Sequence, residues 1–338
     1  MAGPTWTRSA ERGPHVSVLL TVYNLERFVH DAVDSLGRQS FRDFEVVVAD
    51  DGSTDATIEI LEKNPHGLSQ RLVTGPNVGV GANRARAVEM CRGQLIAFLD
   101  GDDRLRPDHL RSAAAALSTY PEAALFYCDR ILIDESGTEL GRALVQKDLD
   151  EGQRWVADPT VLLSWNYIGC SGVVVRRSAL AAVGGIDPAM KAESDIWFRI
   201  ACSFPIYYAS TATVEYRVRS DGLYSDAEDI LRWRLALYEK HAALVGARRP
   251  ELTASAHLRT AYRQLWPTPT PESVALARRN IGRAFRLRPR SIFGRRELAM
   301  VICAGLGKLH VLAVRRYGAW LASRGLKTHL QRFLRIRR

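Results

Sequence analysis

Three carboxylates occupy four positions in the segment Asp100-Gly101-Asp102-Asp103, directly after the apolar run at 95–99. An apolar strand that ends in carboxylates carries these charges to the rim of a sheet. There, oxygen ligands can hold a hard divalent cation with coordination positions left for phosphates. The segment therefore predicts a cation site that faces a phosphorylated ligand.

Two other predicted strand ends carry polar side chains. The run at 15–24 ends in Thr21-Val22-Tyr23-Asn24, and the strand at 44–49 ends in Asp50-Asp51. Helical spacing follows each strand, at 26–39 and at 56–63. Strands that alternate with helices of this length imply a mainly parallel sheet with right-handed crossovers. The three polar clusters should then meet at one rim of the sheet.

The second half of the sheet is expected to be mixed. A strand at 123–134 is followed by a hairpin turn at 135–138, and a further strand is expected at 172–176. Further helices are expected at 108–119, 179–183 and 193–202. The loop 141–168 contains Trp155, Trp165 and Tyr167, whose rings either stack on a sugar or fill the core.

The last third of the chain reads as helical. A proline-rich linker interrupts it at 266–271, and a break is expected near Arg288-Pro289. The fold class is therefore α/β, a mixed and mainly parallel sheet flanked by helices, with a C-terminal helical region. We expect a disordered arm at 1–14, a first domain at 15–225 and a basic helical region at 226–338.

Charge is distributed unevenly along the 338 residues, whose net charge is +10. Residues 276–338 hold 17 lysines and arginines against the single acid Glu297, about +16, which leaves about −6 for residues 1–275. No aromatic-interleaved RNA module is visible, so no nucleic-acid partner is expected. The tail favours peripheral contact with an anionic membrane through 276–338, and an ordinary solvated basic face is the alternative.

Cysteine usage and the apolar segments indicate a cytoplasmic protein. The five cysteines are scattered and form no CxxC pair, so neither a disulfide framework nor a zinc site is indicated. The first 13 residues have no signal-peptide core, and the apolar stretch 298–314 is interrupted by Gly305, Gly307, Lys308 and His310. We therefore expect a cytoplasmic location, with the inner face of the membrane as the place of any peripheral contact.

Over residues 15–225 the sequence resembles the family 2 glycosyltransferases, which have the GT-A fold. The order and spacing of several short motifs carry this resemblance. They are Val16-Ser17-Val18 through Thr21-Val22-Tyr23-Asn24, Val48-Ala49-Asp50-Asp51-Gly52-Ser53-Thr54-Asp55, Asn77-Val78-Gly79, Phe98-Leu99-Asp100-Gly101-Asp102-Asp103 with Pro107, Val183-Gly184-Gly185-Ile186-Asp187 and Asp195-Ile196-Trp197-Phe198-Arg199.

The resemblance implies roles for the residues at the strand ends. Thr21, Tyr23 and Asp51 would contact the nucleotide, the tyrosine by stacking on the base and the aspartate by accepting from its polar edge; a turn-capping role is the alternative for Asp51. Asp102 would bind Mg²⁺ or Mn²⁺, which neutralises a diphosphate leaving group. Asp100 and Asp103 would help to bind the ribose, the cation or the donor sugar.

The motif that would supply the catalytic base departs from the family pattern. The family has a Glu-Asp pair before the Asp and Trp of this motif, whereas this chain has Ala192-Glu193-Ser194-Asp195-Ile196-Trp197. Alignment on Trp197 places Glu193 where the catalytic aspartate of the family stands, so Glu193 is the favoured base. Asp195 is the alternative base, or else a capping or salt-bridge residue.

A second departure lies at Tyr216-Arg217-Val218-Arg219, where the family often has Tyr-Arg-x-His with the histidine near the pyrophosphate. The resemblance places Arg217 and Arg219 among the donor-binding residues. Arg219 would replace the histidine with a permanent cation beside the phosphates, which could alter the metal dependence. An exposed structural arginine is the alternative.

Together these features predict an inverting glycosyltransferase. A metal-assisted reaction would move a sugar from a nucleotide-diphosphate donor to a glycan, wall-polymer or lipid-linked acceptor. A UDP-sugar is the favoured donor. The missing Glu-Asp pair leaves one alternative open, a catalytically weak nucleotide-sugar-binding subunit that recruits partners through its basic tail. Nucleotidyl transfer is disfavoured, because the segment 19–25 lacks a glycine- and lysine-rich phosphate loop.

Overall fold

The computed structural model divides the chain into two compact units, residues 1–222 and 223–338. It describes residues 13–143, 152–156, 158–164, 166–191, 193–219, 221–222, 226–265 and 270–288. The arm expected at 1–14 lies almost wholly outside these residues. The expected linker at 266–271 and the segment 298–314 lie largely or wholly outside them as well.

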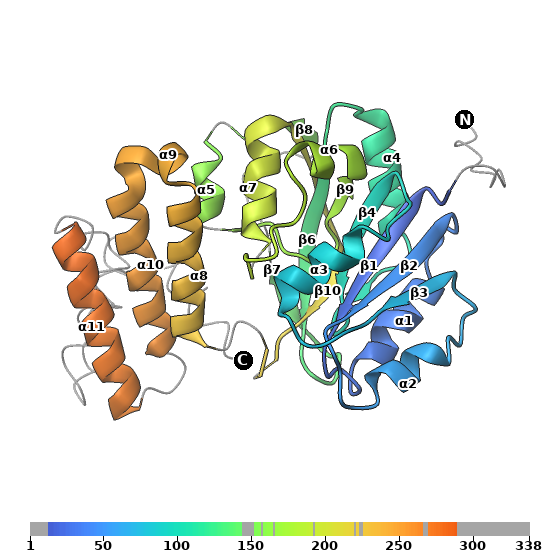
Figure 1. Ribbon diagram of the computed structural model, residues 1–338, viewed down its shortest axis with the longest axis horizontal. Coiled ribbons are helices and arrows are strands. Elements are labelled where there is room, and N and C mark those ends of the chain that lie inside the picture. The colour runs from blue at the N-terminus through green and yellow to red at the C-terminus, as the bar shows by residue number, and fades with distance from the viewer. Residues whose placement is uncertain are drawn as a thin grey trace, which may run out of the picture. The chain divides into compact units, whose positions relative to one another are not determined.

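The first unit is built on one mixed sheet, in the strand order β3-β2-β1-β4-β9-β6-β10-β5, with β7 paired to β6 and β8 paired to β10 (Figure 1). Its strands are β1 (Val16–Val22), β2 (Phe44–Asp50), β3 (Gln70–Val73), β4 (Leu95–Asp100), β5 (Arg104–Leu105), β6 (Leu125–Ile133), β7 (Glu139–Ala143), β8 (Gly152–Arg154), β9 (Val174–Arg176) and β10 (Ile206–Arg217).

The predicted division of the sheet is confirmed. Strands β3, β2, β1 and β4 are parallel, whereas β9 runs antiparallel to both β4 and β6. The strand β10 was not predicted. Its centre, Ala209-Ser210-Thr211-Ala212-Thr213, has little apolar patterning, and its register against β6 shifts between Ala209 and Val214.

Helices cover both faces of this sheet (Figure 1). The helices of the first unit are α1 (Val29–Gly37), α2 (Thr57–Glu62), α3 (Val80–Val88), α4 (His109–Thr119), α5 (Thr160–Ser164), α6 (Arg177–Ala182) and α7 (Ser194–Ser203). The helices α1, α2 and α4 contribute to one core, and α3, α5, α6 and α7 contribute to the other.

The strand β1 shows why the two cores form. Val18 and Leu20 pack into the core that includes α1 and α4, whereas Leu19 packs into the core that includes α3 and α7. Successive side chains of a strand point to opposite faces, so a continuous apolar run buries both faces. Burial of both faces holds β1 in the sheet, and the end of β1 carries Thr21 at the rim.

The described part of the second unit, residues 226–265 and 270–288, is helical, as expected from its sequence. It comprises α8 (Ala227–Lys240), α9 (Ala242–Val245), a short 3₁₀ turn at Gly246–Arg248, α10 (Arg249–Gln264) and α11 (Pro271–Leu287). Asp226 caps α8, and Thr270 forms a capping box with Ser273 at the start of α11. Glu228 on α8 accepts hydrogen bonds from Gln264 (2.6 Å) on α10 and from Asn280 (2.8 Å) on α11. None of the helices in the described residues is both long and apolar enough to cross a membrane.

Candidate active site

The register of the parallel strands brings the polar strand ends together. Thr21 on β1 pairs with Asp100 on β4, and Val22 pairs with Asp50 on β2. The amide of Gly101 donates to the carbonyl of Thr21 (2.9 Å), which continues the contact beyond the strands. The predicted convergence of the three clusters at one rim is therefore confirmed.

Arg84 on α3 is the centre of the site. Its Nε donates to Thr21 Oγ1 (3.1 Å), and its two terminal nitrogens form ion pairs with Asp100 and Glu193. The side chains of Arg84 and Glu193 are each only 4% exposed. One guanidinium thus links the ends of β1 and β4 to the start of α7, at a depth where charged hydrogen bonds are strong.

The sequence interpretation did not identify Arg84, although the pattern held a signal. Arg84 lies on the buried face of α3 with Gly81, Ala87 and Val88. An arginine at helical spacing among small and apolar residues is almost never fully buried without a partner. That placement marks it as a residue that pairs with carboxylates elsewhere in the fold.

The three aspartates of the acidic turn, residues 100–103, have different environments. The side chains of Asp100 and Asp102 are 28% and 22% exposed, whereas Asp103 is buried and accepts a hydrogen bond from the Arg217 amide (2.7 Å). Burial raises the pKa of Asp102, and the neighbouring Asp100 adds to this effect. The pKa of Asp103 is raised well above its ordinary value, first by burial and then by Asp102 and Asp100. Asp100 and Asp102 are thus the two that a ligand can reach.

The donor chemistry of Asp100 and Asp102 fits a hard divalent cation, because carboxylate oxygens are its preferred ligands. No group of three acidic, histidine or cysteine side chains is arranged to hold an ion within the described residues. Asp102 Oδ2 instead lies 2.9 Å from Arg219 Nη1, and Asp100 pairs with Arg84. A cation bound here would therefore need further ligands from a diphosphate or water.

The two residues expected at the nucleobase differ in their accessibility. Tyr23 is 47% exposed and therefore accessible to a ligand. Asp51 is buried, and its two oxygens accept from the amides of Val78 (2.9 Å) and Gly79 (3.0 Å). The carboxylate thereby shapes the turn before α3, where Gly79 has the positive φ of 88° that favours glycine.

The two candidate bases lie in different surroundings. Glu193 immediately precedes α7 and reaches Arg84, as described above. Asp195 is fully buried, and its Oδ2 accepts from Arg199 at 2.6 Å and 3.0 Å. Arg199 also binds the carbonyls of Val183 and Gly185, so the Asp195 pair holds the turn before α7.

Arg217, the last residue of β10, and Arg219 both lie against the ring of Phe28. The guanidinium carbons of Arg217 and Arg219 lie 5.0 Å and 4.9 Å from the centroid of Phe28. Arg217 is buried and donates to the carbonyl of Asp102 (2.8 Å) and to Asp31 (2.6 Å). Arg217 therefore holds the backbone of the acidic turn, whereas Arg219 contacts the carboxylate of Asp102.

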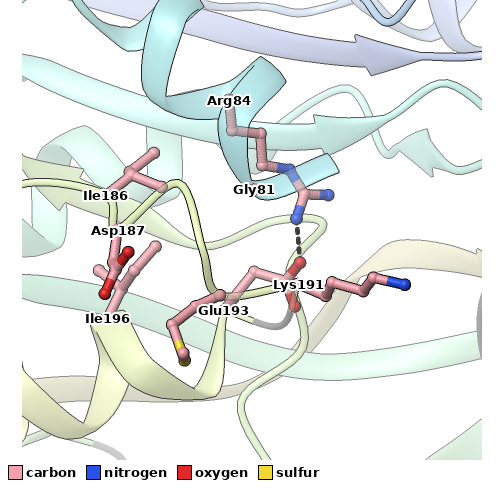
Figure 2. Close-up of a pocket in the computed structure, with 8 residues that line it drawn as sticks. Gly81, Arg84, Ile186, Asp187, Lys191, Glu193 and Ile196 are labelled. Atoms are coloured by element: carbon pink, nitrogen blue, oxygen red, sulfur yellow. Dashed lines mark hydrogen bonds and ion pairs between the residues drawn. The ribbon is translucent and has the colours of Figure 1, made fainter. Parts of the chain in front are cut away.

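A small cavity of about 10 Å³, room for about one water molecule, lies beside Arg84 and Glu193 (Figure 2). Figure 2 shows the Arg84–Glu193 ion pair in its wall, with Ile186 and Ile196 nearby. A Cβ atom on Gly81 would lie 2.1 Å from the carbonyl oxygen of Met190, so α3 approaches the loop before α7 as closely as only glycine allows. The lining residues are Gly81, Arg84, Ile186, Asp187, Met190, Lys191, Glu193 and Ile196.

The aromatic residues of the loop 141–168, for which sugar stacking and core packing were both open, differ in their exposure. Trp155 is 61% exposed, whereas Tyr167 is buried in the core that contains α7. Trp165 lies outside the described residues. Tyr167 is thus a core residue, whereas Trp155 is accessible.

Part of the chain matches a known protein family. Residues 17–170 match the model described as glycosyl transferase family 2. The putative glycosyltransferase EpsH of Bacillus subtilis is 25% identical over 242 residues, 69% of this chain and 69% of that protein. The poly(ribitol-phosphate) beta-N-acetylglucosaminyltransferase TarS of Staphylococcus aureus is 32% identical over 48% of this chain, but this match spans only 28% of TarS.

Solved structures share the fold. The crystal structure of S. aureus TarS 1-349 in complex with UDP-GlcNAc aligns with a TM-score of 0.55 and 20% identity, covering 86% of this chain and 79% of that one. The mannosyltransferase PcManGT from Pyrobaculum calidifontis, in complex with GDP-Man and Mn²⁺, aligns with a TM-score of 0.52 and 18% identity over 89% of this chain and 88% of that one. These likenesses confirm the expected α/β architecture.

Proposed function

Because residues 17–170 match glycosyl transferase family 2, we propose that the chain belongs to this family and transfers a sugar from a nucleotide-diphosphate donor, with a UDP-sugar as the favoured donor, to a hydroxyl group of its acceptor. The proposed acceptor is a glycan, a cell-wall polymer or a lipid-linked glycan, and the reaction belongs to the domain expected at 15–225. The observation that carries the proposal is the Arg84 cluster, formed by Arg84 with Thr21, Asp100 and Glu193. It joins Glu193 to Asp100, beside the exposed edge of Asp102.

We assign nucleotide binding to the ends of β1 and β2. The exposed ring of Tyr23 would stack on the base, with Thr21 beside it. Each carboxylate oxygen of Asp51 accepts one amide bond and has lone-pair capacity for a second, so Asp51 would accept from the base edge while it holds the turn. Arg219 would contact the diphosphate through its guanidinium, a geometry that suits phosphate oxygens.

Asp102 would hold Mg²⁺ or Mn²⁺, with Asp100 supporting the cation, the ribose or the donor sugar, whereas the buried Asp103 would support them through the shape of the turn. Such a cation supplies positive charge that stabilises the departing diphosphate. Arg217 fixes the backbone of the turn through the Asp102 carbonyl and keeps the Asp102 carboxylate at the rim. The buried Asp103 adds a second anchor through the Arg217 amide.

Glu193 would act as the general base. Its carboxylate lines the cavity beside α3, so an acceptor hydroxyl placed there is within reach of it. The hydroxyl proton passes to Glu193 while the acceptor oxygen forms a bond to the anomeric carbon. The bond between that carbon and the phosphate oxygen breaks, and its electron pair leaves with the diphosphate. Attack from the face opposite the leaving group inverts the configuration.

A donor screen tests the proposal. UDP-, GDP- and dTDP-sugars would be incubated with the full chain, with and without Mn²⁺, and release of the nucleotide measured. UDP-GlcNAc comes first, because TarS was solved with it. We expect metal-dependent hydrolysis of one class of donor and its loss in Asp102→Ala. Binding of a nucleotide-sugar without turnover in the presence of any acceptor would favour the alternative, a binding subunit.

We also propose that the chain contacts a membrane peripherally through residues 276–338. Arg279, Arg283 and Arg286 are exposed on α11, and Phe285 and Leu287 on the same helix are 49% and 43% exposed. Basic side chains interleaved with apolar ones suit an anionic lipid surface. Replacing the three arginines by glutamine should reduce cosedimentation with phosphatidylglycerol vesicles. Unchanged binding would leave a solvated basic face as the explanation.

A further inference from the structure

Arg219 has a more constrained position than a surface arginine. Its side chain is 13% exposed, and its Nη1 lies 2.9 Å from Asp102 Oδ2. Its Nε donates to Asp221 (3.0 Å), and its guanidinium lies over the face of Phe28. Two carboxylates and one ring therefore hold this cation at the rim of the sheet.

The contact with Asp102 is separate from the contacts that hold the acidic turn. Arg217 binds the carbonyl oxygen of Asp102, so the backbone stays in place whatever the carboxylate binds. Arg219 binds the carboxylate itself, which is the group assigned to a metal ion above. The Asp102 side chain can thus exchange one cationic partner for another without unfolding the turn.

A guanidinium and a divalent metal ion compete for the charge of one carboxylate. Arginine has only hydrogen-bond donors and no lone pair for a metal, and its charge repels a divalent ion a few ångströms away. A diphosphate changes this balance, because its oxygens accept from a guanidinium and coordinate a cation at the same time.

We propose that Arg219 is the resident counter-cation of Asp102 in the nucleotide-free enzyme and competes there with the divalent metal. When the donor arrives, Arg219 transfers its hydrogen bonds from Asp102 to the diphosphate and thereby frees the carboxylate for the metal. The inference rests on the proposed function for the identity of the donor. It predicts weak metal binding without nucleotide, and nucleotide binding that persists in part without metal.

Binding of Mn²⁺ alone to the nucleotide-free full chain tests the competition directly. Electron paramagnetic resonance of free Mn²⁺ should show a Kd at least about tenfold lower for Arg219→Gln than for the wild type. This gain in Mn²⁺ affinity should vanish in the double variant Arg219→Gln/Asp102→Asn. Circular dichroism melting would verify that each variant is folded.

Arg27 offers a matched control. Its guanidinium also lies 4.9 Å from the Phe28 centroid, but it pairs with the half-buried Glu135 (2.9 Å) instead of Asp102. Arg27→Gln removes the same charge from the same ring and should leave the Kd for Mn²⁺ unchanged. Equal Kd values for Mn²⁺ in the wild type and Arg219→Gln would overturn the proposal. An equal gain in Mn²⁺ affinity in Arg219→Gln and Arg27→Gln would overturn it as well.

A second measurement concerns the nucleotide. In EDTA, Arg219→Gln should bind UDP about tenfold more weakly than the wild type, whereas Arg219→Lys should retain more of the affinity. An unchanged UDP affinity in Arg219→Gln would refute the transfer of Arg219 to the diphosphate. If the wild type binds neither UDP nor GDP nor dTDP, the proposed donor class fails, and the Mn²⁺ measurement still decides the competition.

Discussion

Two buried carboxylates at the start of α7, Glu193 and Asp195, each bind an arginine, but the arginines have different partners. Among the residues that the structure describes, Arg84 binds only side chains, those of Thr21, Asp100 and Glu193. Arg199 binds Asp195 and the carbonyl groups of Val183 and Gly185. The partners of Arg84 can move to a ligand, whereas the partners of Arg199 include the backbone itself. We infer that the Arg84 cluster serves the reaction and the Arg199 cluster maintains the scaffold.

The largest effect should come from Glu193→Gln. Glutamine fills the same space and still accepts from Arg84, but it cannot take a proton. We expect the turnover number to fall on the order of 10³-fold, about 4 kcal/mol in activation free energy, with little change in nucleotide affinity. Steady-state kinetics and titration calorimetry with the nucleotide measure the two quantities. Wild-type turnover in this variant would refute Glu193 as the base.

Asp195→Asn should have the opposite profile. It leaves Arg199 without its carboxylate, and breaking a buried ion pair is strongly destabilising. We expect the free energy of unfolding to fall by about 3 kcal/mol in urea denaturation, with turnover per folded molecule near that of the wild type. An Asp195→Asn protein that is stable but inactive would transfer the role of base to Asp195.

His109 extends the comparison to a scaffold group on the other face of the sheet. It is fully buried at the start of α4, with its Nδ1 2.8 Å from Thr213 Oγ1, and burial lowers its pKa from 6.5 to about 4. The unfolded chain binds this proton at a higher pH than the folded one. The stabilisation is therefore complete above about pH 6.5 and is lost as the pH falls towards 4.

Between pH 7 and pH 5 this group should remove about 2 kcal/mol from the free energy of unfolding. His109→Gln should show a correspondingly smaller loss over the same interval. Urea denaturation of both proteins at the two pH values measures the difference. The same loss in both proteins would assign the acid sensitivity to other groups, those of the site included.

Much of the fold could be predicted because its signals are local. The strands β1, β2 and β4 are continuous apolar runs, and the helices α1, α2 and α4 have clear spacing and lie close to where they were expected. The strand β10 was missed because its centre consists of small and polar residues, and its pairing with β6 supplies the order that local propensity lacks.

The sequence by itself determined that Thr21, Asp51 and the acidic turn share one rim, because parallel strands place their carboxyl ends together. Only the tertiary structure decided which groups pair at that rim. The partners of Arg84 lie 16, 63 and 109 residues away along the chain. Likewise, Arg219 meets Asp102 across 117 residues. Such contacts depend on how strands and helices pack, and no local periodicity encodes them.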